Sequence, residues 1–138
     1  MNGHRECGVT LLEMLVAMAI MAMVGALTFP ALDNAIAALT FRGSIDLMER
    51  DLYDARAAAI VSQRPVIVTS SRDGQTYGQT GMRPRRAPAG ISFAIAPSAI
   101  VFFGDGSSSG GALVIQRSAQ RALISVDSTT GAVAVRAR

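Results

Sequence analysis

Few of the side chains that serve in catalysis and metal binding are present in this sequence of 138 residues. It has one cysteine, one histidine and no lysine, so all 13 basic residues are arginines. A single cysteine, Cys7, excludes an intrachain disulfide. The arginine bias is attributed to a GC-rich genome rather than to selection for guanidinium chemistry. The net charge of +3 is mild and does not by itself indicate a nucleic-acid partner.

An apolar run from Val9 to Phe29 contains one charged residue, Glu13, close to its start. As a helix this run would be roughly 30 Å long, which is the hydrocarbon thickness of a bilayer. An ionised group on a membrane-spanning helix costs roughly 2.5–3.5 kcal/mol at the bilayer centre and less near an end. Because nothing else in the run is charged, Glu13 is predicted to be functional and to pair with a group on another chain.

Three interpretations of this run compete. A cleaved secretory signal would use Arg5 as its basic region and the small residues 24–26 as its cleavage site. Such signals have only about 7–15 apolar residues, so this run is too long for one. A lipoprotein anchor on Cys7 is disfavoured because that modification places the cysteine after the apolar stretch. A plain transmembrane anchor explains everything except Glu13 and the abrupt boundary at Gly8.

The segment Gly8-Val9-Thr10-Leu11-Leu12-Glu13-Met14-Leu15-Val16 resembles the class III signal of type IV pilins and type II secretion pseudopilins. The resemblance implies that prepilin peptidase cuts between Gly8 and Val9 and methylates the new N-terminus on Val9. Glu13 is then the fifth mature residue, as in the family, and Pro30 falls where many members carry a proline. The sequence departs from the family at Val9, since the first mature residue is more often Phe or Met.

The physical chemistry of Glu13 and Pro30 is consistent with the roles that the resemblance implies. In a filament the apolar helices pack together, and Glu13 could pair with the α-amino group of a neighbouring subunit, so that each charge offsets the desolvation of the other. Pro30 lacks an N–H and clashes with the carbonyl four residues earlier, so a kink or a locally melted turn is expected there. Pro30 could equally mark the boundary where the helix leaves the membrane.

The resemblance and the hydropathy pattern together divide the chain into four expected segments. Residues 1–8 would be the prepilin leader, 9–29 the transmembrane and filament-core helix, 30–63 an amphipathic continuation of that helix, and 64–138 a periplasmic β-domain. The continuation carries apolar residues at spacings of three and four, which predicts one face packed on the following domain. These residues are Ala38, Phe41, Ile45, Met48, Leu52, Ala55 and Ala59.

Beyond Arg64-Pro65, which ends the helix, short strands are predicted. They cover residues 66–70, 76–79, 91–94, 100–103, 112–116, 122–127 and 132–136. Their short connectors favour antiparallel hairpins. The predicted fold class is α+β: a long N-terminal helix, transmembrane in its first half, packed on an antiparallel, β-sandwich-like C-terminal domain of the type IV pilin kind.

Two motifs in the C-terminal half, over residues 100–111 and 126–133, resemble the minor pseudopilin H of type II secretion. That group shares its domain family with minor pilins of the FimT and FimU kind. The resemblance implies an assembly protein and not an enzyme, single-pass in the inner membrane, with a cytoplasmic leader and a periplasmic domain. Its partners would be prepilin peptidase, other minor and major pseudopilins, and the inner-membrane assembly platform. Together they would form the pseudopilus that exports folded proteins through the outer-membrane secretin.

No catalytic, metal or cofactor site is predicted. His4 and Cys7 would leave with the leader, so the mature chain would have no His or Cys ligand or catalytic pair. Asp73, Asp105 and Asp127 are isolated in the sequence. The loop at residues 104–111 has no lysine and no following helix, so it is predicted to be a flexible hairpin and not a phosphate-binding loop.

One basic concentration is present at Arg83-Pro84-Arg85-Arg86, with Arg136 and Arg138 at the terminus. A solvated loop is the simplest interpretation, and Arg83, Arg85 and Arg86 remain a candidate contact patch for acidic partner surfaces or DNA. Nucleic acid is disfavoured because no aromatic residues are interleaved and the basic stripe is short. A minor type IV pilin of a tip complex, a DNA-uptake pilin and a plain membrane-anchored domain remain alternatives.

Overall fold

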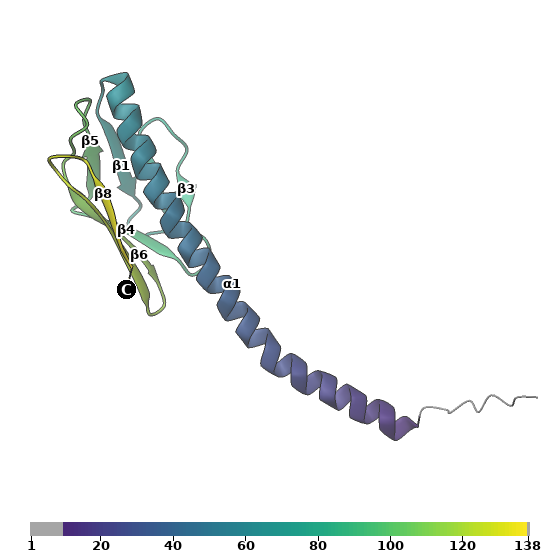
Figure 1. The fold of residues 1–138 in the computed structure, drawn as a ribbon. Helices are drawn as coiled ribbons and strands as arrows, with labels where there is room; N and C mark the ends of the chain where they lie inside the picture. The colour runs from purple at the N-terminus through teal and green to yellow at the C-terminus, as the bar shows by residue number, and fades with distance from the viewer. Residues whose placement is uncertain (1–9, 138) are drawn as a thin grey trace, which may run out of the picture. The chain divides into compact units, whose positions relative to one another are not determined.

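The computed structural model describes residues 10–137 and shows one long helix followed by short strands (Figure 1). The helix, α1, spans Leu11–Ser62. The strands are β1 Val66–Ser70, β2 Thr76–Gln79, β3 Arg85–Arg86, β4 Ser92–Ala96, β5 Ala99–Phe102, β6 Gly111–Arg117, β7 Gln120–Val126 and β8 Val133–Ala137. The chain forms two compact units, divided between Leu39 and Thr40, and α1 runs through both.

In the N-terminal unit, α1 exposes nearly all of its apolar side chains. Met21, for example, is 77% exposed, and Leu11 80%. The helix is long and apolar enough to cross a membrane. Apolar surface of this extent is stable only when lipid or another chain covers it.

The helix is continuous through Pro30, so of the two alternatives expected there the locally melted turn is wrong, and the kink stays a prediction. The proline removes one backbone hydrogen bond, while the turns on either side keep theirs and hold the helical conformation.

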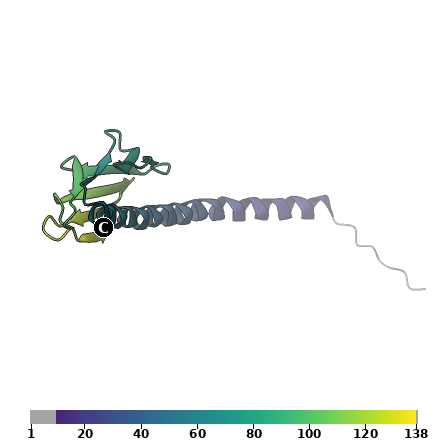
Figure 2. The ribbon, with the colours of Figure 1, turned by 90° about the horizontal axis from the view of Figure 1, so that it is seen from above.

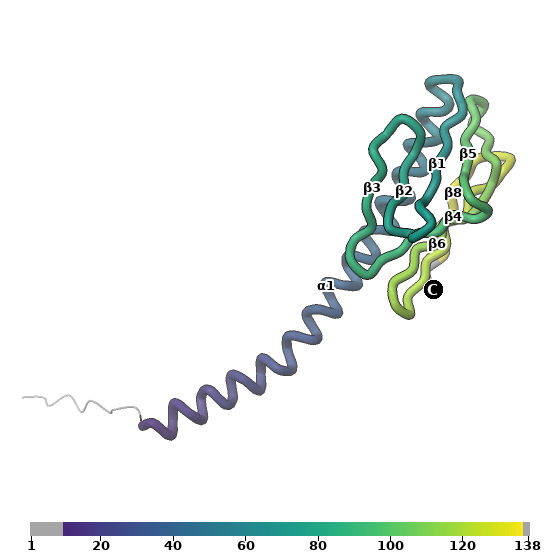
Figure 3. The backbone as a smooth tube through the Cα atoms, turned by 180° about the vertical axis from the view of Figure 1, so that it is seen from behind, coloured from purple at the N-terminus to yellow at the C-terminus, as the bar shows by residue number. Residues whose placement is uncertain are grey.

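The C-terminal unit contains two four-stranded antiparallel sheets. One has the strand order β3-β2-β1-β5, which Figure 3 shows side by side, and the other has the order β4-β6-β7-β8. The register pairs Val68 with Ile100 in the first sheet and Leu113 with Ile124 in the second. The predicted α+β class with an antiparallel two-sheet domain is confirmed.

One hydrophobic core joins the helix to both sheets, and Figure 2 shows the last turns of α1 against the strands. Its helical members are Phe41, Ile45, Met48, Leu52, Ala55 and Ala59, which were predicted from their spacing. Ala38 of the same predicted stripe is only half-buried and belongs to the N-terminal unit. Buried Ser44 lies on the packed face as well, and its hydroxyl donates to the Thr40 carbonyl at 2.9 Å.

The connection between β5 and β6 is not the flexible hairpin that the sequence suggested. β5 pairs with β1 and β6 pairs with β4 and β7, so this loop passes from one sheet to the other. It is held by backbone hydrogen bonds, including Ser108 N–H to Ser128 O at 3.0 Å and Ser109 N–H to Val101 O at 2.8 Å. The expectation was wrong because local spacing reports a turn but not the sheet that the next strand joins.

Candidate functional site

The N-terminal end of α1 places Glu13 in the first turn. Its backbone N–H donates to the hydroxyl of Thr10 at 3.2 Å, which makes Thr10 the N-cap of the helix. An acidic residue in this turn is favoured by the helix dipole. Within residues 10–137 the exposed Glu13 carboxylate makes no hydrogen bond or ion pair. The predicted cleavage site, Gly8 and Val9, lies outside the described residues.

Arg56 of α1 connects the helix to both loops of the C-terminal motifs. Its Nε donates to the Gly106 carbonyl at 3.0 Å and its Nη2 donates to the Thr130 carbonyl at 2.8 Å. A planar guanidinium suits this double role because its donors point in fixed directions. In the sequence Arg56 follows Ala55 of the apolar stripe, but no local pattern predicts its hydrogen bonds to carbonyl groups 50 and 74 positions away.

Asp105 and Asp127 accept hydrogen bonds that stabilise the turns of the same two loops. Asp105 Oδ1 accepts from the Ser107 hydroxyl at 2.6 Å and from its N–H at 2.9 Å. Asp127 Oδ1 accepts from the Thr130 N–H at 2.8 Å and from its hydroxyl at 2.9 Å. These hydrogen bonds lower the pKa of both carboxyl groups, because they favour the charged form. Both aspartates are therefore turn-forming residues in this structure.

The loops also contact each other directly. The Ser108 hydroxyl donates to the Asp127 carbonyl at 2.8 Å, and the Gly110 N–H donates to Ser108 Oγ at 2.9 Å. The motifs that carried the family resemblance therefore form one surface, and the Ser108–Asp127 hydrogen bond joins positions 19 apart in the chain.

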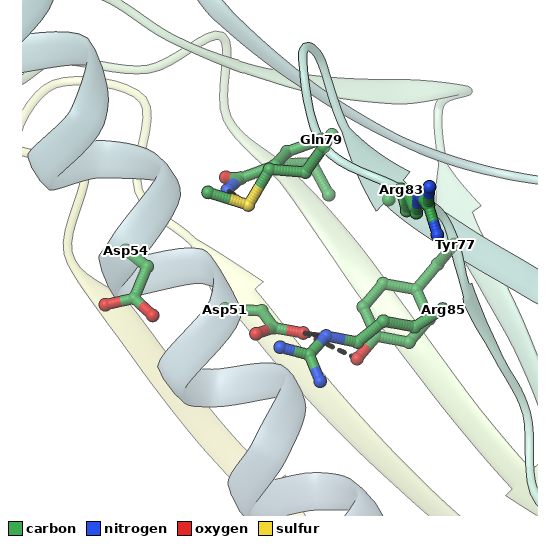
Figure 4. Close-up of a pocket in the computed structure, with 9 residues that line it drawn as sticks. Asp51, Asp54, Tyr77, Gln79, Arg83 and Arg85 are labelled. Atoms are coloured by element: carbon green, nitrogen blue, oxygen red, sulfur yellow. Dashed lines mark hydrogen bonds and ion pairs between the residues drawn. The ribbon is translucent and has the colours of Figure 1, made fainter.

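A cavity of about 180 Å³ lies between α1 and the β2–β3 segment, and we name it the Asp51 cavity (Figure 4). Asp51 Oδ2 accepts from the Tyr77 hydroxyl at 2.6 Å and lies 3.1 Å from Arg85 Nε. The side chain of Asp51 is 22% exposed and that of Arg85 is 55% exposed. Burial raises the pKa of Tyr77, and its bond to Asp51 raises it further. The ring of Tyr77 packs edge-on against Phe93, with centroids 4.9 Å apart.

The candidate basic patch is only partly the solvated loop that was predicted. Arg85 and Arg86 form β3, a short exposed edge strand paired with β2, while Arg83 lies in the exposed loop before it. Arg85 is engaged by Asp51. Arg136 is in β8 of the other sheet, and Arg138 lies outside the described residues.

The carboxylates of the described segment are dispersed. Among residues 10–137 there is no group of three or more His, Cys, Asp or Glu side chains that could hold a metal ion.

Solved structures with a similar fold are pilin-like proteins. The minor pseudopilin EpsH of the type 2 secretion system of Vibrio cholerae is 11% identical, with a TM-score of 0.59, covering 70% of this chain and 95% of its own. The type IV minor pilin FimU of Pseudomonas aeruginosa is 12% identical, with a TM-score of 0.57, covering 70% and 96%. A second crystal form of FimU gives 13% identity, a TM-score of 0.58, and coverage of 71% and 92%. The curated proteins include no match to this sequence.

The sequence also matches two family patterns. Residues 3–29 match the prokaryotic N-terminal methylation motif. Together with the fold, this motif defines a type IV pilin-like protein. Residues 45–130 match the family described as Type II transport protein GspH, so the chain belongs to the GspH family of pseudopilins.

Proposed function

We propose that this protein is a minor pseudopilin of a type II secretion system and that it works by assembly and not by catalysis. The proposal rests on one observation, which is that two features occur in the same chain. The methylation motif covers residues 3–29, and the GspH domain covers residues 45–130. In this account, the subunit joins a periplasmic pseudopilus that helps move folded proteins through the outer-membrane secretin.

In this proposal, the N-terminal part of the chain inserts into the membrane and is processed by prepilin peptidase. Residues 1–8 are the cytoplasmic leader, prepilin peptidase cleaves between Gly8 and Val9, and Val9 becomes the methylated N-terminus. Residues 9–29 cross the inner membrane as one helix, which is supported by the exposed apolar side chains of α1. Pro30 then marks the membrane exit, and residues 30–63 carry the helix into the periplasmic domain of residues 64–138.

Glu13 is the docking residue in this proposal. Its carboxylate has no partner within residues 10–137 and lies in the first turn of α1. A methylated α-amino group on a neighbouring subunit would neutralise it in an apolar bundle, where either charge alone is costly. The other partners are minor and major pseudopilins and the inner-membrane assembly platform.

A deletion strain tests the assignment. We expect exoproteins to accumulate in the periplasm of the deletion strain and to return to the culture supernatant on complementation, both measured by proteomics. Unchanged secretion, in a strain whose secretion machine is demonstrably active, would contradict the assignment.

A minor type IV pilin is the second candidate, because the match to FimU, with a TM-score of 0.57, is nearly as good as the match to EpsH, with 0.59. This alternative predicts intact secretion with loss of surface pili or of DNA uptake on deletion. A DNA-contact role for Arg83, Arg85 and Arg86 would give salt-sensitive binding that their joint replacement abolishes. The engagement of Arg85 by Asp51 counts against that role.

A further inference from the structure

The two sheets of the described C-terminal unit have four edge strands, and three of these are protected against pairing with another chain. The loop after β5 covers the outer edge of that strand, because Val101 donates to Ser109 Oγ at 3.0 Å and accepts from the Ser109 N–H at 2.8 Å. The β1–β2 segment covers the outer edge of β4, where the Phe93 N–H donates to the Gly74 carbonyl at 2.9 Å. β3 consists of two arginines, and a short, charged edge strand resists pairing.

The fourth edge strand, β8, is longer and mostly apolar (Figure 1). Its pairing with β7 fixes the direction of its backbone groups. The Asp127 N–H donates to the Ala132 carbonyl at 2.9 Å, so residues 132, 134 and 136 bond to β7. The N–H and carbonyl groups of Val133 and Val135 therefore point away from β7.

Val135 lies at the centre of this outer edge. The Tyr53 hydroxyl of α1 reaches the Val133 carbonyl at 3.5 Å, which confirms that the Val133 carbonyl points away from β7. The N–H and carbonyl of Val135 have no hydrogen-bond partner within residues 10–137, and the residue is 37% exposed. An edge strand with free backbone groups is a template on which an extended segment of another chain can pair.

Two arginines determine which segment fits this edge. Arg136 of β8 and Arg121 of β7 lie on the same face of the sheet, opposite to the face that buries Ile124. Both arginines are exposed, and neither has an ion pair within residues 10–137. Acidic side chains on an added strand would pair with these arginines, whereas basic side chains would be repelled. A second copy of β8 is disfavoured for the same reason, because it would bring a second Arg136 to this edge.

We propose that β8 accepts an extended, acidic segment of a partner protein as a fifth strand of its sheet. The segment accepts a hydrogen bond from the Val135 N–H and donates one to the Val135 carbonyl. Its acidic side chains lie beside Arg136 and Arg121, and this charge pairing selects it over a neutral or basic segment. The proposal does not depend on which secretion or pilus machine the protein serves.

A titration of the isotope-labelled full chain in detergent micelles tests the proposal. The probe is the capped peptide Glu-Val-Thr-Val-Glu. The control is the same peptide with its inner backbone amides N-methylated, which keeps the side chains and charge but removes the donors. We expect a saturable NMR shift and slowed solvent exchange of the Val135 amide proton with the probe and neither with the control.

Three results of this titration would overturn the proposal. The first is the absence of a saturable shift at Val135, and the second is an equal shift with the N-methylated control. The third is protection of the Val135 amide proton that rises with protein concentration before any peptide is added, because a second copy would then be the occupant.

Two proline variants distinguish the outer edge from the fold. Val135→Pro removes an N–H that points away from β7, so the Tm should change little. Binding of the fluorescently labelled probe, measured by anisotropy, should weaken about tenfold or more, because the segment loses a donor and meets the proline ring. Ala134→Pro removes an N–H that bonds to β7 and should lower the Tm clearly. Undiminished binding by Val135→Pro, or equal losses of Tm in the two variants, would overturn the proposal.

A charge reversal tests the choice of an acidic segment. Arg136→Glu should weaken binding of the acidic probe about threefold or more, because an attractive pair becomes a repulsive one. Arg42→Glu makes the same change of net charge at an exposed position of α1 and should bind the probe as the wild type does. Equal affinities of the two variants would contradict the selection of an acidic segment and would overturn the proposal.

Discussion

At the scale of single residues, the surface formed by the C-terminal loops depends on a tight approach around Gly131. This glycine is buried and has a φ of +64°, in the left-handed region that favours glycine. A Cβ atom there would stand 2.9 Å from Arg56 Nε and would collide with the Gly106 carbonyl. The guanidinium of Arg56 can therefore reach both loops only while this position has no side chain.

Gly131→Ala should destabilise the protein by about 3 kcal/mol, because left-handed strain and a backbone collision add together. Gly90→Ala is the matched control, since Gly90 has a φ of +76° but no atom within 4 Å of its Cβ position. That variant should lose about 1–2 kcal/mol from strain alone. Urea unfolding monitored by circular dichroism gives both free energies of unfolding. Equal losses of stability in the two variants would contradict the close approach of Arg56 and Gly106 to Gly131.

Asp127 should make stability depend on pH. Its hydrogen bonds to Thr130 lower its pKa in the folded state below the ordinary 3.8, so the unfolded state binds more protons between the two pKa values. The stabilisation is present above pH 3.8 and is lost as pH falls through the folded-state pKa. Asp127→Asn should flatten the dependence of the unfolding free energy on pH below 3.8. An unchanged slope in Asp127→Asn would refute the assignment.

At the scale of elements, the packed face of α1 is set by small residues as much as by large ones. Ala55 and Ala59 are fully buried, and a methyl group at these positions allows the strands to approach the helix closely. The face thus depends on the volume at each position as well as on apolar spacing.

Ala55→Leu should cost about 1–3 kcal/mol, because added methylene groups overfill a close-packed core. Ala57→Leu places the same side chain on the exposed face of the same helix and should change stability by no more than about 0.5 kcal/mol. Thermal or urea unfolding compares the pair. A similar loss in both variants would show that helix propensity, and not packing, accounts for the effect.

Much of this architecture was predictable because it is encoded locally. The second half of α1 has a 3.6-residue apolar period, and strands such as β1 have continuous or alternating apolar residues between turn signals, so the sequence predicted their positions. β3 was missed because its residues, Arg85 and Arg86, are both charged and form a strand only by pairing with β2. Its existence is a property of the sheet edge and not of its own sequence.

The candidate sites were less predictable because their parts come from distant segments. Asp51 and Tyr77 are 26 positions apart and Arg56 and Thr130 are 74 positions apart, and no local pattern reports such pairs. The sequence showed the two loop motifs, but it could not show that one arginine joins them. The docking role of Glu13, in contrast, is predicted from the sequence alone, because a lone charge in an apolar run is informative without any fold, and it stays a prediction.

At the scale of the whole molecule, two units with opposite solvent requirements are joined by one helix. The C-terminal unit buries its own core, whereas the described part of the N-terminal unit exposes apolar side chains along its length. Such a chain needs lipid or a bundle of like helices around residues 11–29. A subunit that passes from membrane to filament satisfies that need in both places.

Glu13→Ala should leave processing and membrane insertion intact while strongly reducing incorporation into the filament, because the charge that pairs with a neighbouring N-terminus is lost. Glu13→Gln should behave similarly, since it keeps the size but not the charge. Asp33→Asn is the control, as an exposed acid further along the same helix. Crosslinking of the subunit to its neighbours in isolated pseudopili measures incorporation. Wild-type crosslinking by Glu13→Ala would contradict the charge-pair role.

Processing as a pilin-type filament subunit would leave its mark on the intact mass of the protein extracted from membranes of its natural host. We expect a chain that begins at Val9 and carries one added methyl group, and a full-length chain when Gly8 is replaced by a bulky residue. A wild-type chain that still contains residues 1–8, or one cut after Ala26 as a secretory signal would be, would contradict it.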